Sequence, residues 1–159
     1  MIFRHLTFAA LAAAAPAVSS PALAATPHHA TGTFEVKIVP ATEDKGPDGG
    51  STLSRLTLDK AYAGALTATS KGEMLAAGGS VPTSAAYVAV ERITGTLDGR
   101  AGSFAVVQHG WKQGDQRVMD VMIVPDSGGG ALKGLAGTFR IEIKDGKHFY
   151  VMDYTLDGQ

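Results

Sequence analysis

The chain contains no cysteine and no asparagine, and it has a single tryptophan among its 159 residues. Without cysteine, no disulfide can hold the fold together, so stability has to come from packing and backbone pairing. Without asparagine, the chain has no acceptor for N-glycosylation. Neither sign of charge dominates, since 14 Lys and Arg face 15 Asp and Glu. This balance supplies no basic field for nucleic acid or for an anionic membrane surface.

The first two dozen residues have the pattern of a secretory signal peptide. Arg4 and His5 precede an apolar stretch at residues 6–15, and Ala22-Leu23-Ala24 is a small-residue cleavage site. The apolar stretch is shorter than the roughly 20 residues that span a bilayer. We therefore expect cleavage after Ala24, no stable membrane span after cleavage, and a bacterial protein of the periplasm or the secreted fraction.

The mature chain of about 135 residues is long enough for one domain and too short for two. It has no stretch with a helical period, whereas strand-like runs recur between glycine-rich breaks. These runs cover residues 31–39, 53–62, 65–75, 87–97, 103–111, 118–124, 139–144 and 147–156. Short connections between them are typical of an up-and-down barrel or a small sandwich.

We predict an all-β fold, a closed antiparallel meander barrel of about eight strands, as a single domain over residues 31–157. Residues 41–50 and 126–130 are rich in Gly, Pro and Asp and are predicted to be loops. The signal peptide takes residues 1–24, and residues 25–30, with the neighbouring His28 and His29, are predicted to be a disordered tail.

Two Asp-Gly dipeptides predict tight hairpins, because Asp98-Gly99 and Asp145-Gly146 both accept positive φ at the two central positions of the turn. The second turn sets a register in which His148 and Tyr150 share the inner face with Phe139. Alternatively, His148, which lies one residue from the turn, sits at the rim of the sheet and only packs.

The first hairpin places a carboxylate on the face that looks like the core. In its register Glu91 and Gln108 share that face with Phe104. A carboxylate there has to be hydrogen-bonded, paired or protonated, because desolvating the ion alone costs several kcal/mol. A bulge near Gly102 would reverse the two faces and turn His109 inward instead. Both arrangements remain open, as does an exposed Glu91.

Glu73, in the preceding strand run, could approach Glu91 if the two strands are neighbours. Two carboxylates that share a cavity would raise one pKa and make a potential acid-base pair. Alternatively, Glu73 is a solvated residue at a strand edge. His109 and His148 lack the spacing of a histidine metal site, and no phosphate-binding or nucleophile motif occurs, so we expect no metal and no cofactor.

Several short motifs occur in order along the mature chain. They are Thr31-Gly32-Thr33-Phe34, Lys71-Gly72-Glu73-Met74-Leu75, residues 87–92, Gly102-Ser103-Phe104 with His109-Gly110, residues 124–128, and Asp145-Gly146-Lys147-His148 with Tyr150 and Tyr154. On these motifs the chain resembles domain-of-unknown-function family 3224 (DUF3224). The resemblance implies an antiparallel barrel similar to that of allene oxide cyclase, closed around an apolar cavity. It implies no reaction, because shared barrels host unrelated functions.

Our first functional prediction is that the barrel interior binds a small, largely apolar ligand. The polar side chains expected to orient it are Tyr87, Glu91, Gln108, His148 and Tyr150. A second hypothesis is a cofactor-free isomerase or cyclase, with Glu91 or Glu73 as general base and His109 or a tyrosine as general acid. A third is a structural or oligomerising domain with a solid core. Phe149 and Val151, which point outward in the predicted register, suggest a homodimer interface.

Overall fold

The computed structural model describes residues 25–156, and in this part of the chain all regular structure is β-strand. The strands are β1 (His28–Asp44), β2 (Thr52–Gly64), β3 (Leu66–Gly78), β4 (Ser84–Leu97), β5 (Arg100–Gln113), β6 (Gln116–Ile123), β7 (Gly129–Gly130), β8 (Ala136–Lys144) and β9 (Lys147–Thr155). The described residues hold no helix that is long and apolar enough to cross a membrane. The predicted signal peptide lies outside the described residues.

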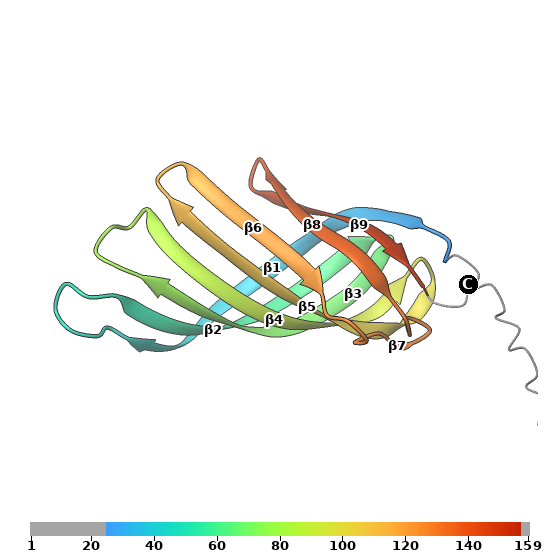
Figure 1. Cartoon of the computed structure of the whole chain (residues 1–159), viewed down its shortest axis with the longest axis horizontal. Helices are drawn as coiled ribbons and strands as arrows, with labels where there is room; N and C mark the ends of the chain where they lie inside the picture. Colours follow the sequence, from blue (N-terminus) through green and yellow to red (C-terminus); the bar gives the residue numbers. More distant parts are fainter. Residues whose placement is uncertain (1–24, 157–159) are drawn as a thin grey trace, which may run out of the picture.

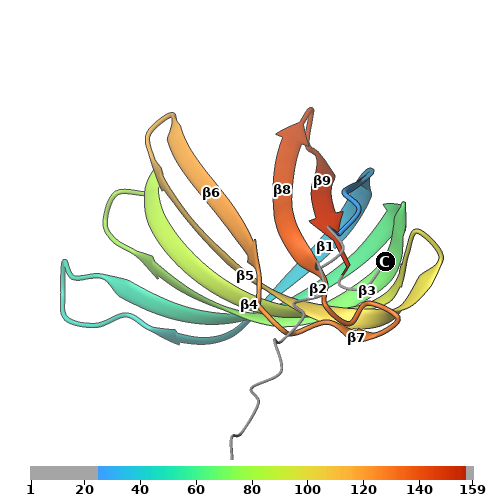
Figure 2. The same cartoon turned by 45° about the vertical axis from the view of Figure 1, so that its right-hand side comes forward.

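Eight of the strands form a closed antiparallel barrel, which confirms the predicted fold class. Each strand pairs with its neighbour along the chain from β1 to β6, then β6 pairs with β8, β8 with β9, and β9 closes the circle on β1. The ninth, two-residue strand β7 pairs with β5 at Gly102 and Ser103. Figures 1 and 2 show the sheet curling round on itself with long hairpins extending from one end.

The predicted boundaries of the first strand are wrong at both ends. β1 begins at His28, inside the predicted tail, and it continues to Asp44, inside the predicted loop, with a register shift between Pro40 and Thr42. The first part of β1 pairs with β9, where the His28 ring stacks on Tyr154 with ring centroids 5.0 Å apart. This pairing joins the two ends of the domain, so no local pattern in residues 25–30 could indicate it.

Both predicted Asp-Gly turns are confirmed. Asp98 and Gly99 have φ of 47° and 77°, and Asp145 and Gly146 have 52° and 74°, as a two-residue turn with both φ angles positive requires. The register between β4 and β5 runs without interruption past Gly102, so no bulge reverses the faces. Inward and outward side chains therefore alternate as the hairpin rule predicted.

The two ends of the barrel differ in how they are filled. At one end, which we call the closed end, the strands meet a plug formed by Leu132 and Leu135, both buried, from the segment between β7 and β8. At the other end, the open end, the long hairpins splay apart. There β1 and β9 stop pairing at Phe34 and His148, and β6 and β8, which pair only at Met122 and Thr138 nearer the closed end, diverge (Figure 1).

Tyr150 fills the closed end. Its side chain is fully buried, and its hydroxyl accepts a hydrogen bond from the Leu66 backbone N–H at 2.7 Å and donates one to the Ala63 carbonyl at 3.4 Å. The ring has room because two glycines face it, since a Cβ at Gly32 would lie 2.5 Å from the Tyr150 hydroxyl and one at Gly64 would lie 3.2 Å from it. Tyr150 is thus a packing residue of the core.

Candidate functional site

Four polar side chains meet inside the barrel, one from each of four consecutive strands. Lys60 comes from β2, Ser70 from β3, Glu91 from β4 and Gln108 from β5, and all four are buried. Each lies on the inward phase of its strand, because successive side chains alternate between the two faces of a sheet. Of the arrangements left open for the first hairpin, the structure shows the one in which Glu91 and Gln108 face the interior, since Glu91 is 1% and Gln108 8% exposed.

The Glu91 carboxylate is fully engaged by this group. Oε1 accepts a hydrogen bond from Lys60 Nζ at 2.6 Å, and Oε2 accepts one from the Ser70 hydroxyl at 2.8 Å. A charged donor and a hydroxyl together offset the desolvation of the ion, which would otherwise be costly. Tyr62, also inward on β2, feels the same charge: burial, and then the Glu91 carboxylate, raise the pKa of its phenol well above the ordinary value.

Lys60 makes two further contacts. Its ammonium lies 3.4 Å from Gln108 Oε1 and 5.0 Å from the centre of the Phe34 ring. A cation over the face of an aromatic ring is attracted by the ring quadrupole. Lys60 therefore has favourable contacts with a carboxylate, an amide oxygen and a ring, and it forms the floor of the space above it.

That space is a cavity of about 310 Å³ at the open end of the barrel. Its wall is mostly apolar, with Lys60, Tyr87, Gln108 and His148 as polar members and Phe34, Val36, Ile38, Leu58, Met74, Met119, Ile141 and Ile143 as the others. At the rim, Ile38 is 47%, Met119 39% and Ile143 45% exposed. A mostly apolar concavity with a few convergent polar groups is typical of a small-molecule site, which starts at about 300 Å³.

The structure brings three of the five predicted ligand contacts to this cavity. Tyr87 and Gln108 lie on its wall, and Gln108 Nε2 donates to the Tyr87 hydroxyl at 2.5 Å. His148 also lines it and packs against Phe34 with ring centroids 5.0 Å apart, near the rim. Glu91 acts from behind Lys60 and does not line the cavity, and Tyr150 lies in the closed end.

Glu73 and His109 do not belong to the interior. Glu73 lies on the outer face of β3, where its carboxylate forms two hydrogen bonds with Arg55 of 2.7 and 2.9 Å, and its side chain is 59% exposed. The Arg55 guanidinium lowers the pKa of Glu73. His109 is exposed on the outer face of β5 opposite Val88. Of the two alternatives for Glu73, the structure therefore shows the solvated one, and the acid-base pair with Glu91 does not form because the two side chains point to opposite sides of the barrel wall.

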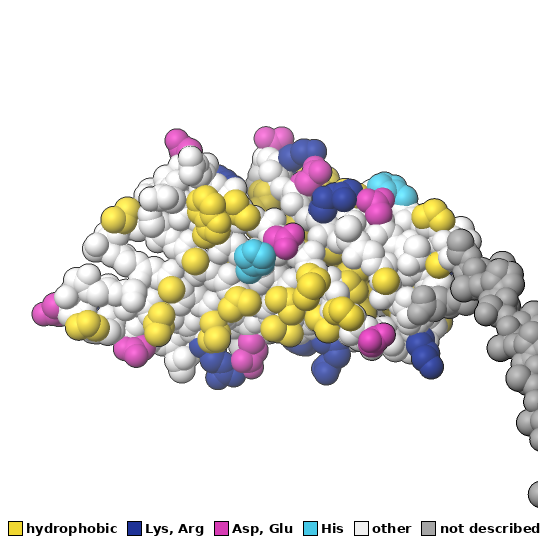
Figure 3. Space-filling view, in the orientation of Figure 1, with side chains coloured by type: hydrophobic (Ala, Val, Ile, Leu, Met, Phe, Trp, Pro, Cys, Tyr) yellow, Lys and Arg dark blue, Asp and Glu magenta, His cyan; other side chains and the backbone are white. Residues whose placement is uncertain are grey.

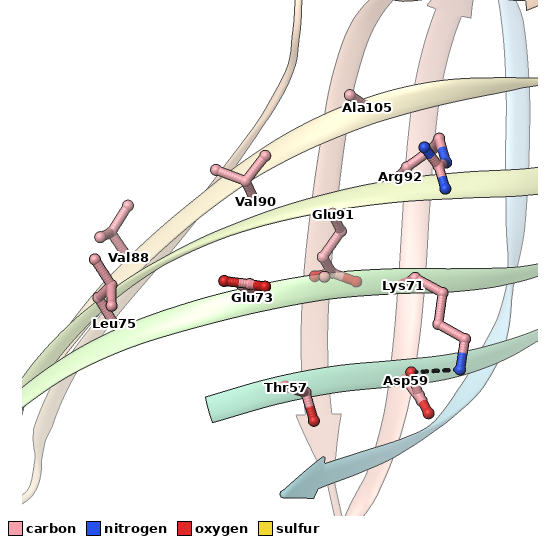
Figure 4. A pocket seen from close by; sticks show the side chains of 11 residues that line it. Thr57, Asp59, Lys71, Glu73, Leu75, Val88, Val90, Glu91, Arg92 and Ala105 are labelled. Carbon is pink, nitrogen blue, oxygen red and sulfur yellow. Dashed lines mark ion pairs between the residues drawn. The ribbon is translucent and has the colours of Figure 1, made fainter. Parts of the chain in front are cut away.

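Figure 4 shows the wall from outside, along a groove over β2 to β5. The groove is lined by Leu75, Val88 and Val90. Two of its charged side chains pair with each other, with Lys71 Nζ 2.8 Å from Asp59, and Glu73 pairs with Arg55. Hydrophobic side chains gather along this side of the barrel (Figure 3). Phe149 and Val151 point outward on β9 but are partly buried, and the homodimer stays a prediction.

Sequence reasoning missed Lys60 and Ser70. A signal for Lys60 was present, because Leu58, Lys60 and Tyr62 alternate with outward residues and therefore share one face of β2. Ser70 is small enough to fit beneath Glu91, and its position opposite Ile93 on β4 follows only from the pairing of β3 with β4. Within the described residues no group of three or more His, Cys, Asp or Glu side chains could hold a metal ion.

Comparison with known proteins adds a family and a solved structure. Residues 30–154 match the family model described as "Protein of unknown function (DUF3224)". The chain is also similar to a crystal structure of a DUF3224 protein of unknown function from Shewanella oneidensis MR-1, with 40% identity and a TM-score of 0.75. The match covers 83% of this chain and 99% of that one. No curated protein matches the sequence.

Proposed function

Because the chain belongs to the DUF3224 family, for which no activity is described, we propose from its cavity that it binds a small, largely apolar molecule in the open end of its barrel. The observation that carries the proposal is the combination of about 310 Å³ of mostly apolar space with Tyr87, Gln108 and Lys60 along one side. A barrel of eight strands is wide enough to hold one small ligand.

The geometry favours binding over the acid-base hypothesis. A general base has to reach the proton that it removes, at about 2.6 to 3.2 Å. Both oxygens of Glu91 are occupied by Lys60 and Ser70, and the carboxylate does not line the cavity. The alternative base, Glu73, and the candidate acid His109 lie on the outer surface. The likeness to the barrel of allene oxide cyclase stays a prediction, and nothing in this geometry suggests a shared chemistry.

Filling the cavity tests the proposal directly. Ile38 points into the cavity from β1, whereas the next residue, Val39, points outward, and the two are similarly exposed at 47% and 43%. Ile38→Trp should therefore abolish binding of a neutral fluorescent probe, N-phenylnaphthylamine, and Val39→Trp should leave it within about twofold of the wild type. Thermal unfolding of both variants provides the check that each is folded.

Equal probe binding by the wild type and Ile38→Trp would place the binding surface elsewhere and would contradict the proposal. No probe binding to the wild type, together with no co-purified molecule in native mass spectrometry, would favour the structural domain instead.

We also infer that the protein is exported. The signal-like pattern of residues 1–24 is the support, and β1 begins at His28, so cleavage after Ala24 would leave every strand of the barrel intact. Intact-mass measurement of the protein from its own host should give a chain that starts at Ala25. A chain in the cytoplasmic fraction that retains Met1 would contradict export.

A further inference from the structure

The donor and the acceptor can be assigned for each hydrogen bond that links Lys60, Gln108 and Tyr87. An ammonium can only donate, so Lys60 donates to Gln108 Oε1, and this assigns Oε1 to the side of Lys60 and Nε2 to the side of Tyr87. An amide nitrogen also only donates, so the Tyr87 oxygen accepts the bond from Gln108. The chain from Lys60 through Gln108 to Tyr87 therefore ends in the phenolic proton of Tyr87.

The Tyr87 proton has no acceptor among the described residues. The Tyr87 ring lies over Gly110, where a Cβ would come within 2.7 Å of it, and the residue forms part of the cavity wall. Burial raises the pKa of Tyr87, and the nearby Glu91 carboxylate raises it further against the opposing effect of the Gln108 bond. The hydroxyl thus stays protonated at neutral pH and is polarised by the donors behind it.

The net charge around Lys60 indicates which kind of acceptor the Tyr87 hydroxyl can bind. Lys60 and Glu91 form a close ion pair of zero net charge, with Nζ and Oε1 2.6 Å apart. Glu91 already neutralises Lys60, so a ligand carboxylate beside Tyr87 would give the site a net negative charge, and a net charge is costly in an apolar enclosure. An uncharged oxygen acceptor would take the hydrogen bond without that penalty.

We propose that the ligand is an uncharged carbonyl compound with a hydrocarbon tail, whose oxygen accepts a hydrogen bond from the Tyr87 hydroxyl. The tail then lies along the apolar wall formed by Phe34, Leu58 and Ile141 toward the open rim. This inference rests on the proposed function and narrows it from apolar molecules in general to one chemical class.

The experiment compares three compounds of equal chain length as competitors of N-phenylnaphthylamine on the mature protein: nonane, methyl heptyl ketone and nonanoate. The wild type should bind the ketone more tightly than nonane by about tenfold, the value of one net hydrogen bond, and more tightly than nonanoate. Tyr87→Phe should bring the affinity for the ketone to within about twofold of the affinity for nonane. Tyr154→Phe, which removes a hydroxyl at the closed end, should keep the wild-type preference.

Equal affinity for nonane and the ketone would overturn the carbonyl assignment and leave ligand binding intact. A preference for nonanoate, or a ketone preference that persists in Tyr87→Phe, would also overturn it. Failure of all three compounds to compete with a bound probe would overturn it likewise, whereas failure of the probe itself to bind would remove the proposed function as well.

Discussion

The closed and open ends of this barrel are built from the same eight strands, but their interiors differ. At the closed end Leu97, Tyr150 and Tyr154 are 0 to 2% exposed, and the Tyr154 hydroxyl reaches across to Asp98 in the β4–β5 turn at 2.6 Å. At the open end the inward residues Ile38 and Ile143 are nearly half exposed. The number of strands alone therefore does not decide whether side chains fill the interior of a barrel.

Side-chain volume accounts for the difference. Inward positions toward the open end include Gly72 on β3, Ala89 on β4 and Gly110 on β5, which place few side-chain atoms of their own in the interior, and the two glycines make room for Glu91 and for the Tyr87 ring. The closed end holds aromatic rings in contact with one another, with Tyr150 5.8 Å from both Phe139 and Tyr62 between ring centroids. The chain therefore concentrates its few aromatic residues where the barrel is sealed.

Between the two ends lies the layer of Lys60, Ser70, Glu91 and Gln108. This layer is polar on the inside of an otherwise apolar barrel, and it marks the boundary between packed core and cavity. Substitutions in this layer should therefore affect both the packed core and the cavity, whereas substitutions at either end should affect that end alone.

The largest effect is expected from Lys60→Met, which keeps the length of the side chain and removes its charge. Glu91 would remain buried with only Ser70 as a partner, and breaking a buried pair from one side costs about 3–5 kcal/mol. Urea unfolding monitored by tryptophan fluorescence measures the loss. The control is Lys71→Met in the next strand, because Lys71 pairs with Asp59 on the exposed face and its removal should change little.

If Lys60→Met had the stability of the wild type, the buried Glu91 carboxylate would not depend on a cation. The polar layer would then not be the boundary between packed core and cavity. Replacement of both partners, as Lys60→Met with Glu91→Leu, should recover much of the loss, because two matched apolar groups can substitute for a buried ion pair.

Gly→Ala substitution at each end should have the next largest effect. At the closed end, a Cβ at Gly32 would lie 2.0 Å from the Ala63 carbonyl oxygen and 2.5 Å from the Tyr150 hydroxyl. At the open end, a Cβ at Gly78 would meet nothing within 4 Å. Gly32→Ala should therefore destabilise the protein by about 1–3 kcal/mol, as overpacking does, and Gly78→Ala by less than about 0.5 kcal/mol. Equal losses at both positions in urea unfolding would contradict the contrast between the ends.

The closed end should also lose stability at alkaline pH. Burial, followed by the hydrogen bond and charge of Asp98, raises the pKa of Tyr154 to about 12, while an unfolded tyrosine titrates near 10. Above about pH 10 the unfolded chain therefore releases its proton first, so the stabilising effect present below that pH declines as the pH rises toward 12.

Tyr154→Phe should make the alkaline decline in unfolding free energy shallower without abolishing it, because the pKa values of Tyr62, Tyr87 and Tyr150 are raised too. Urea unfolding at several pH values between about 8 and 11 gives the two slopes. Parallel declines in the variant and the wild type would show that Tyr154 does not contribute.

Local sequence patterns predicted most of the barrel. Alternation placed seven of the runs on the strands β2 to β6, β8 and β9, and the two Asp-Gly turns predicted the register of both hairpins, in which Glu91 and Gln108 share a face with Phe104. The errors lie where distant segments pair. β1 starts earlier than predicted because β9 receives it, and β7 forms in a glycine-rich stretch because β5 has a free edge beside Gly102.

The site could be predicted only where its residues lie close together in the sequence. Glu91 and Gln108 belong to one hairpin, so their shared face followed from a single turn. Lys60 comes from β2, and its contact with Glu91 depends on how the wall curves between β2 and β4, which no two-residue turn specifies. Ser70 was hidden because a serine in a strand has no distinctive pattern.

The smallest effect is expected from Glu73→Gln. This substitution also compares the outer face of the barrel wall with its inner face. The exposed ion pair with Arg55 lowers the pKa of Glu73, so its slight contribution is present above the ordinary carboxyl pKa and declines as the pH falls. At neutral pH the variant should retain both its urea midpoint and its binding of N-phenylnaphthylamine. Glu91→Gln, one strand away but facing inward, should lower the midpoint, because it removes the charge that Lys60 faces. If Glu73→Gln weakened probe binding as Ile38→Trp is expected to do, the outer groove over β2 to β5 would have to be part of the site, and the cavity could no longer account for binding on its own.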